Sequence, residues 1–213
     1  MSQPKKNYQK IMEQQISEIP QGTLPRLLLH CCCAPCSSAV LEYLNRFFSV
    51  TVLYYNPNIS PKEEYEYRKA ELRRLIREYP WENPVSELDC DWESESFRRI
   101  ADGLEQEREG GARCEKCFSL RLSKTAELAK DGGFDYFTTT LTISPLKNAG
   151  LLNELGGRLA DRYGVSYLFS DFKKKDGYKR SIELSAEYGL YRQDYCGCIY
   201  SKQEREQRKA GSE

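Results

Sequence analysis

Short apolar runs alternate along the chain with longer segments whose apolar residues recur at helical spacing. Residues 26–30 form a run short enough to be a buried strand, and residues 50–55 predict a second strand. Between them, residues 37–48 have apolar positions at helical spacing, with Ser37 as the N-cap. Residues 61–79 predict a long helix, because a proline stands at its first-turn position.

The alternation continues toward the C-terminus. The further elements we predict are strands at 85–88, 136–141 and 166–169, and helices at 92–104, 118–130, 148–163 and 178–188. Residues 109–114 contain a Gly-Gly pair and predict a flexible loop. Strand followed by helix, repeated, predicts an α/β fold with a mostly parallel sheet and helices on both faces.

Length and charge limit the organisation of the chain. Within 213 residues we predict a polar N-terminal arm (1–22, a frayed helix), a single α/β catalytic domain (23–201) and a charged C-terminal tail (202–213). Lys plus Arg and Asp plus Glu number 32 each, so local patches rather than net charge would attract a nucleic acid. No apolar run is long enough to span a bilayer or to form a signal peptide, so we expect a cytoplasmic protein without a membrane partner.

Eight of the nine cysteines fall into three clusters, within residues 31–36, 114–117 and 196–198, and only Cys90 stands apart. In a reducing compartment such clusters more often bind metal or catalyse than cross-link. The single histidine, His30, excludes a site of several imidazoles, so thiolate or carboxylate must hold any metal. The first cluster follows a predicted strand and precedes a helix, where α/β sheets bind ligands and a helix N-terminus favours thiolate.

Each cluster has more than one interpretation. The Cys-x-x-Cys pair at 114–117 can reach one metal or cluster, or be two ordinary buried thiols. Residues 33–36 also have the form of a thioredoxin-type motif, but that motif does not use the cysteines before it. The Cys-Gly-Cys at 196–198 can point both sulfurs one way or form a reducible disulfide. Zinc needs four thiolates, whereas seven or eight suit a [4Fe–4S] cluster with a second iron or redox site.

Six separated motifs make the chain recognisable. They are His30-Cys-Cys-Cys-Ala-Pro-Cys36, Tyr55-Asn-Pro-Asn-Ile59, Gly110-Gly-Ala-Arg-Cys-Glu-Lys-Cys-Phe118, Thr138-Thr-Thr-Leu-Thr-Ile-Ser-Pro145, Asp171-Phe-Lys-Lys174 and Tyr191-Arg-Gln-Asp-Tyr-Cys-Gly-Cys198. On these motifs the chain resembles the QueH family of epoxyqueuosine reductases over nearly all of residues 26–201.

The resemblance implies a reaction, cofactors and a fold. The reaction is reduction of epoxyqueuosine to queuosine at the wobble position of tRNA, the last step of queuosine biosynthesis. The implied cofactors are a [4Fe–4S] cluster and an adjacent iron, and the implied fold is Rossmann-like, related to the nucleotide α-hydrolase and PP-loop group. The phosphate-cradling loop of ATP-using PP-loop enzymes is absent after the first strand, so no ATP chemistry is expected.

The resemblance also implies roles for individual residues. The cysteines expected to hold the cluster are Cys32, Cys33, Cys114 and Cys117. Those expected to serve the second iron, or in the last two cases to form a redox-active catalytic pair, are Cys36, Cys196 and Cys198. Cys31 is the least expected ligand of its cluster, because the family motif varies there. The division of the cysteines between the two sites stays open.

The remaining candidates concern the proton and the tRNA. A proton must reach the epoxide oxygen, and the candidate donors are Asp194, Tyr195, Tyr178 and Asp91. The candidates for contacts with tRNA phosphates are Arg113, Lys173, Lys174, Lys175, Lys179 and Arg180. The alternative for the lysine run is a solvated loop. Tyr178, Tyr191 or Tyr195 could stack on a splayed base.

His30 is either a donor to a cluster sulfur or a satisfied core histidine. An electron donor is required, and the sequence does not identify it. Three rival functions are a cytosolic thiol–disulfide oxidoreductase using Cys33 and Cys36, a zinc-stabilised RNA-binding module, and a cluster-dependent tRNA thiolase that would need ATP.

Overall fold

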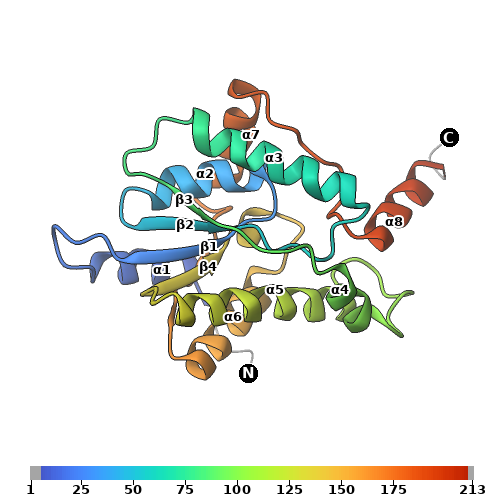
Figure 1. The fold of residues 1–213 in the computed structure, drawn as a ribbon, viewed down its shortest axis with the longest axis horizontal. Coiled ribbons are helices and arrows are strands. Elements are labelled where there is room, and N and C mark those ends of the chain that lie inside the picture. Colours follow the sequence, from blue (N-terminus) through green and yellow to red (C-terminus); the bar gives the residue numbers. More distant parts are fainter. Residues whose placement is uncertain (1–5, 211–213) are drawn as a thin grey trace.

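A parallel sheet of five strands, in the order β3-β2-β1-β4-β5, forms the centre of the molecule (Figure 1). The strands are β1 (Arg26–His30), β2 (Ser49–Leu53), β3 (Ser86–Leu88), β4 (Tyr136–Thr139) and β5 (Ser166–Tyr167). The structure is a computed structural model that describes residues 6–210, so the ends of the predicted arm (1–5) and of the predicted tail (211–213) lie outside it. The α/β fold with a parallel sheet is confirmed.

Helices cover both faces of this sheet, as predicted. They are α1 (Tyr8–Ser17), α2 (Ala34–Leu44), α3 (Lys62–Glu78), α4 (Ser94–Ala101), α5 (Ala112–Asp131), α6 (Ala149–Tyr163), α7 (Gly177–Glu187) and α8 (Ile199–Ala210). Helices α2, α3 and α7 lie on one side of the sheet, and α5 and α6 lie on the other (Figure 1). This two-sided, Rossmann-like arrangement agrees with the prediction. None of the helices that the structure describes is long and apolar enough to cross a membrane.

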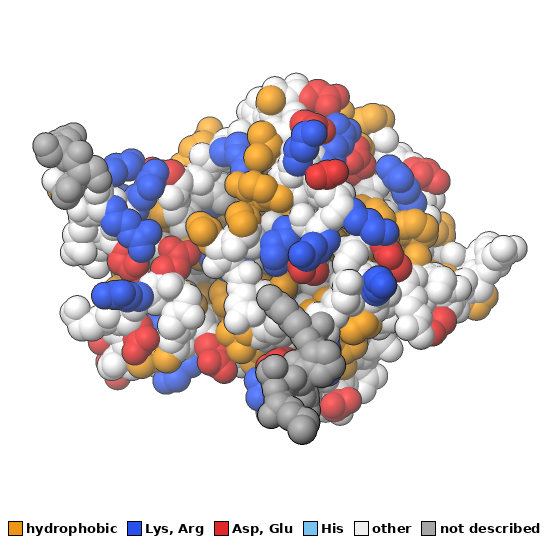
Figure 2. Space-filling view, turned by 180° about the vertical axis from the view of Figure 1, so that it is seen from behind, with side chains coloured by type: hydrophobic (Ala, Val, Ile, Leu, Met, Phe, Trp, Pro, Cys, Tyr) orange, Lys and Arg blue, Asp and Glu red, His pale blue; other side chains and the backbone are white. Residues whose placement is uncertain are grey.

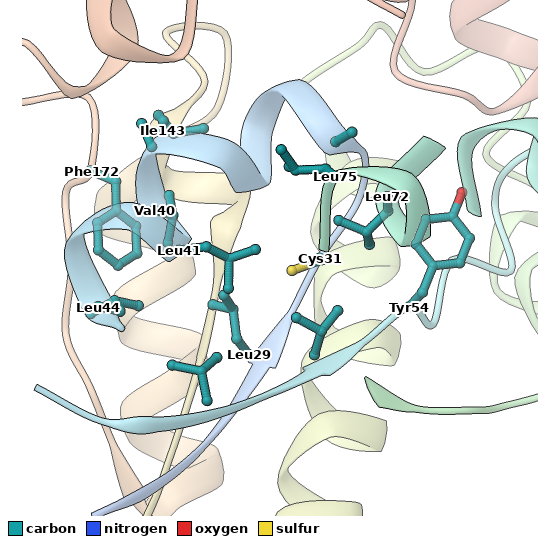
Figure 3. Packing of buried hydrophobic residues seen from close by; sticks show 14 of the residues in the cluster. Leu29, Cys31, Val40, Leu41, Leu44, Tyr54, Leu72, Leu75, Ile143 and Phe172 are labelled. Carbon is teal, nitrogen blue, oxygen red and sulfur yellow. The ribbon is translucent and has the colours of Figure 1, made fainter. Parts of the chain in front are cut away.

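The central strand β1 divides the core into two layers, because successive side chains of a strand point to opposite faces. Leu27 and Leu29 pack with α2 and α3, whereas Leu28 packs with α5 and α6. Cys31 continues the first set and lies in the apolar layer between Leu41 of α2 and Leu72 of α3 (Figure 3). Burial raises the pKa of the Cys31 thiol far above its ordinary value. Cys31 is therefore a core residue.

Helix α1 is packed rather than frayed. Its Met12 is only 1% exposed and belongs to the core layer of α2 and α3. The Gln15 side chain donates to the carbonyl oxygen of Tyr167 at 3.0 Å and accepts from the Phe169 N–H at 3.0 Å. It thus pairs with backbone groups at and just after the end of the edge strand β5, which would otherwise be open. The mostly polar sequence of this segment did not indicate that it docks, because only a few of its side chains, such as Met12 and Ile16, pack on the core.

Two helices that carry cysteines begin earlier than predicted. Helix α2 starts with Cys33 as its N-cap and a proline in the first turn, and the Ser37 hydroxyl donates to the Cys33 carbonyl instead of capping. Helix α5 starts after Gly111, so residues 112–117 are helical instead of part of a loop or lead-in. At β4 the reverse occurs, since the predicted strand end forms the 3₁₀ turn η1 (Thr140–Ile143). All three differences place cysteine or hydroxyl side chains at helix starts.

Candidate metal centre

The sheet has one position where the strand order reverses, between β1 and β4, and the cysteines gather at its carboxyl edge. β1 and β4 are parallel neighbours; β1 leads into α2 on one side of the sheet, whereas β4 leads through η1 to α6 on the other side. Such a switch point opens a crevice for ligands. The Sγ of Cys32, after β1, lies 3.8 Å from the Oγ1 of Thr140, after β4.

Three thiols converge in this crevice. The sulfur atoms of Cys32, Cys33 and Cys36 all lie within 4.8 Å of one another. Cys33 caps α2 and Cys36 lies in its first turn, so one helical turn returns the third thiol to the same side. Across residues 6–210 this is the one group of three or more Cys, His or acidic side chains with ligand atoms that close. The group can bind a metal ion.

The electrostatics of the three thiols suit a cation. Hydrogen bonds from Cys33 and Cys36 lower the pKa of Cys32 well below its ordinary value. The same contacts oppose a second charge, so the pKa of Cys33 rises to about 12 and that of Cys36 rises as well. One thiolate forms readily, and a metal ion would stabilise the others by displacing their protons.

A second group of thiols lies against the first. Cys114 and Cys117, one turn apart on α5, line a narrow cavity of ≈ 10 Å³ together with Cys196 and Cys198. Burial, and secondarily the charge of Cys196, raises the pKa of both helix thiols, that of Cys117 to about 12. Cys196 also lines the neighbouring pocket that contains Cys32 and Cys36, so it connects the two groups.

All nine cysteines have free thiols in this structure. The geometry brings Cys36 to Cys32 and Cys33, and it brings Cys114 and Cys117 to the Cys196-Gly-Cys198 segment. The sequence had grouped Cys32 and Cys33 with Cys114 and Cys117. The assignment of ligands to the two predicted sites stays a prediction.

The Cys196-Gly-Cys198 segment is held in a conformation that requires glycine. Gly197 has a φ of +125°, and a Cβ there would lie 2.9 Å from the Cγ1 of Ile59. The buried Arg68 pairs with Glu64 at 2.7 Å and donates to the Cys196 carbonyl at 3.2 Å. The Ser60 N–H donates to the Gly197 carbonyl at 3.0 Å. Both cysteines of the pair are thereby positioned.

A larger pocket of ≈ 330 Å³ opens over the two thiol groups. Its walls come from the loop at 141–147, from α7 and from the segment at 192–196. Cys32, Cys36 and Cys196 lie in its lining beside apolar residues such as Ile143 and Leu146. Its volume is at the lower end of the range for small-molecule sites, about 300–1,000 Å³.

Lys147, which the sequence analysis missed, lines this pocket. Its side chain is 8% exposed, and its Nζ lies 3.3 Å from the Sγ of Cys196 and 3.2 Å from a carboxylate oxygen of Glu109. Burial alone would lower the pKa of Lys147, but the negative charges of Cys196 and Glu109 raise it above its ordinary value. Lys147 therefore holds a proton and a positive charge beside the thiols. Its position two residues after a quoted motif was the signal available in the sequence.

Arg121 of α5 is a second buried cation at the pocket wall. Its Nε donates to the Nε2 of His30 at 3.3 Å, and its Nη2 donates to the Oδ1 of Asn56 at 2.6 Å. Burial, followed by the charge of Arg121, lowers the pKa of His30 to about 3, so the imidazole is neutral. The other ring nitrogen of His30 lies 2.8 Å from the Oγ1 of Thr139. His30 is thus a satisfied core histidine rather than a donor to a thiol.

The amino-acid sequence of this chain is similar to those of known proteins. Residues 27–204 match the family profile described as "Epoxyqueuosine reductase QueH". The chain belongs to the QueH family. It is 45% identical over 199 residues to the epoxyqueuosine reductase QueH of Streptococcus pyogenes serotype M1, covering 92% of this chain and 78% of that protein.

Two further QueH relatives are also similar over most of the chain. The protein of Staphylococcus epidermidis is 41% identical over 206 residues, which cover 94% of this chain and 87% of that protein. The protein of Thermotoga maritima is 34% identical over 187 residues, which cover 86% of this chain and 94% of that protein. The resemblance that the six motifs indicated is confirmed.

The predicted acids of this QueH-family chain differ in their surroundings. Asp194 and Tyr195 line the larger pocket, as does Tyr178. Asp194 bonds to Lys209 at 2.9 Å and to Arg205 at 3.4 Å, and the first of these bonds lowers its pKa, so it is a carboxylate rather than an acid at neutral pH. Burial raises the pKa of Tyr195. Asp91 is exposed and lies outside the residues that line this pocket.

The predicted phosphate contacts are also unequal. Arg113 is buried, and its guanidinium donates to the carbonyl oxygens of three loop residues, Leu104, Glu105 and Glu107. It holds that loop against α5 and is not accessible to a phosphate in this structure.

The other predicted basic residues lie at the surface, where several are paired. Lys173 pairs with Asp171, Lys175 with Glu13 and Arg180 with Glu42. Lys174 lies beside these groups, in the lining of a 210 Å³ pocket. Acidic and basic side chains also lie next to one another across the face shown in Figure 2. The field that a phosphate would meet here is therefore weaker than the count of lysines indicates.

The last cysteine, Cys90, lies apart from both thiol groups. Its thiol donates to the carbonyl oxygen of Tyr54 at 3.2 Å, and burial raises its pKa to about 11. It behaves as an ordinary, partly buried thiol.

Proposed function

We propose that this chain reduces epoxyqueuosine to queuosine at the wobble position of tRNA, the last step of queuosine biosynthesis. Its relatives are named epoxyqueuosine reductase, and the QueH family model spans most of the chain. The observation that carries the proposal is the convergence of Cys32, Cys33 and Cys36 at the wall of a ligand-sized pocket in a chain of this family.

The residues present fit an iron–sulfur centre. Six free thiols line two adjoining pockets, a seventh, that of Cys33, lies within 4.8 Å of two of them, and the buried cations Lys147 and Arg121 lie beside them. We propose that these cysteines hold a [4Fe–4S] cluster and a second iron, since seven thiols exceed the four that one structural zinc takes. Bound there, the centre would supply the two electrons of the reduction one at a time.

The larger pocket supports the substrate side of the proposal. Its ≈ 330 Å³ can take one modified base with its cyclopentane substituent, but not a duplex, so the wobble nucleotide would be splayed out of the anticodon loop. Tyr178, at the pocket wall and partly exposed, offers a face on which a base can stack. Lys174 and Lys179 are exposed lysines within four residues of Tyr178 in sequence, and they would contact phosphates.

Lys147 supplies the charge that the reaction needs. As the epoxide C–O bond breaks, negative charge develops on the oxygen, and a fixed cation in a dry pocket stabilises that charge. The raised pKa of Lys147 keeps the proton on its Nζ before the reaction, where the oxygen can receive it. Glu109 fixes the ammonium in place at 3.2 Å. A tRNA substrate and free thiols are both consistent with a reaction in the cytoplasm, with electrons from a separate donor.

The test uses protein purified without oxygen. Iron and sulfide are measured, the protein is reduced chemically, and tRNA that carries epoxyqueuosine is added and its nucleosides are analysed by mass spectrometry. Wild-type protein should contain iron and sulfide and should form queuosine. Cys36→Ala should lose metal and turnover, whereas Cys90→Ala, a matched partly buried thiol outside both groups, should keep them.

Two other results would point to the rival functions. A colourless protein that binds zinc and RNA without turnover would indicate an RNA-binding module. A colourless protein that exchanges disulfides through Cys33 and Cys36 would indicate a thiol–disulfide oxidoreductase.

A further inference from the structure

Arg121 is a buried cation whose hydrogen bonding is incomplete. It is 1% exposed, and although its Nε and Nη2 donate to His30 and Asn56, its Nη1 has no hydrogen-bond partner. Burial acts to lower the pKa of Arg121, and interactions with the cysteines, that of Cys117 first, raise it, yet Nη1 is left without a partner. A buried N–H without an acceptor costs about 1–3 kcal/mol, and more for a charged group.

Arg121 also lacks a carboxylate counterion. Buried Arg68 pairs with Glu64 and buried Arg113 with Glu204, but within residues 6–210 Arg121 forms no ion pair with an acidic side chain. The groups that would act on it as anions once ionised are thiols of the two cysteine groups, Cys117 first and then Cys32 and Cys196. A buried charge without a partner costs several kcal/mol, so we expect Arg121 to have an anionic partner. The groups nearest to it that can carry negative charge are these sulfurs, so that partner should lie beside them.

The surrounding residues fix the direction of the guanidinium. An arginine Nε only donates, so the Nε2 of His30 must accept, and the proton of the neutral ring is then on Nδ1, which donates to the Oγ1 of Thr139. The Tyr55 carbonyl, 3.1 Å from the same Nε2, receives no proton from it in this tautomer. Asn56 is fixed in turn, because its Nδ2 donates to the Cys31 carbonyl at 2.8 Å. Two nitrogens of Arg121 are thus anchored to β1 and the loop after β2, and the third is left free.

We propose that Arg121 is a positioning residue for the metal centre, and that its Nη1 donates an N–H···S hydrogen bond to a sulfur of the iron–sulfur centre. This inference rests on the cofactor part of the proposed function. A thiolate-held cluster is negatively charged, so it is the counterion that Arg121 lacks. Donors to cluster sulfurs and nearby positive charge stabilise the reduced form more than the oxidised form. Arg121 therefore raises the reduction potential of the centre and makes its electrons available at a less negative potential.

The experiment measures reduction potential and thermal stability in protein purified and loaded without oxygen. Arg121→Met has similar length without charge or donors. At a fixed ambient potential near the wild-type midpoint, its ratio of reduced to oxidised cluster should fall at least tenfold, which is about 59 mV for a one-electron couple. In addition, loading with iron and sulfide should raise the Tm of Arg121→Met by less than it raises that of the wild type.

The matched control is Arg74→Met. Arg74 is an arginine of α3 that donates to Glu71 and to the Tyr188 carbonyl, and it does not line the pockets that contain the thiols. It should lower the Tm of the apo and loaded forms equally and leave the potential unchanged. If Arg121→Met behaves in that way, Arg121 is only structural and the inference is overturned.

Arg121→Lys keeps the charge but loses the fork of donors, and it decides the matter if Arg121→Met does not load. A shift of its potential in the same direction supports the hydrogen bond, and an unchanged potential overturns it. If wild-type protein takes up no iron and sulfide, the cofactor proposal itself has failed, which is a separate outcome.

Discussion

Gly197 separates the two cysteines of the third cluster, and its replacement by alanine tests whether the backbone there positions them. A Cβ at this residue would lie 2.9 Å from the Cγ1 of Ile59 and 3.1 Å from the Nη1 of Arg68, inside normal contact distance. The φ of +125° is also one that residues with a side chain rarely adopt. Gly197→Ala therefore adds a steric clash and backbone strain at the same residue.

The two effects can be given rough sizes. Overpacking in a tight environment costs about 1–3 kcal/mol, and a residue held in a sparsely populated backbone region costs about 1–3 kcal/mol. The segment can relieve both by moving, because local opening costs less than global unfolding. Even a total of about 2 kcal/mol would lower the ratio of native to displaced conformations of the segment by about 30-fold. Iron content and the rate of queuosine formation should fall accordingly, while Tm falls only slightly.

The assay compares iron and sulfide content, turnover and Tm for wild type, Gly197→Ala and Gly189→Ala. Gly189 also has a positive φ, +56°, but nothing lies within 4 Å of an added Cβ. Gly189→Ala should lower Tm through strain of about 1 kcal/mol and leave metal content and turnover unchanged. Wild-type iron content and turnover in Gly197→Ala would refute the reasoning, because the pair would then not depend on the glycine.

Three more predictions concern stability. Arg68→Met leaves the partly buried Glu64 without its ion-pair partner and frees the Cys196 carbonyl, so it should cost about 1–3 kcal/mol in denaturant unfolding and reduce iron content. Met12→Ala should cost about 2–5 kcal/mol without loss of metal, because no residue of α1 lines either pocket that contains the predicted ligands. Glu42→Gln should cost about 1 kcal/mol at pH 7, because the ion pair with Arg180 lowers the pKa of Glu42 but is partly exposed. The difference between Glu42→Gln and wild type should vanish at a pH well below 4.5, where the wild-type carboxyl is protonated and, like the amide, carries no charge.

Matched variants separate these effects from general damage. Arg98→Ala breaks an exposed ion pair with Glu95 on α4 and should change stability by less than about 0.5 kcal/mol. Lys10→Ala, on the exposed side of α1, should do the same. A Met12→Ala protein as stable as Lys10→Ala would show that α1 does not dock. A Glu42→Gln difference that persists at low pH would assign it to packing rather than to charge.

Part of the fold could be predicted because its signals are local. The strand at 26–30 has the predicted bounds, since a central parallel strand is buried on both faces and its three interior residues are all leucine. The start of α5 was placed too late, because residues 112–117 have no apolar periodicity and a Gly-Gly pair normally predicts a loop. In the structure Gly111 is instead the N-cap of that helix. Helix starts depend on capping geometry, which composition shows poorly.

The sequence by itself determined the kind of chemistry: free thiols in three clusters, one of them after a central strand, in a chain with the motifs of the QueH family. Only the tertiary structure decided which thiols meet, because α5 and the segment before α8 are far apart in sequence and come together through packing. It also decided that Cys31 is core and that Arg121 and Lys147 are buried beside the sulfurs. Charged residues are usually solvated, so a sequence cannot show which of its 32 basic residues folding will bury without a carboxylate partner.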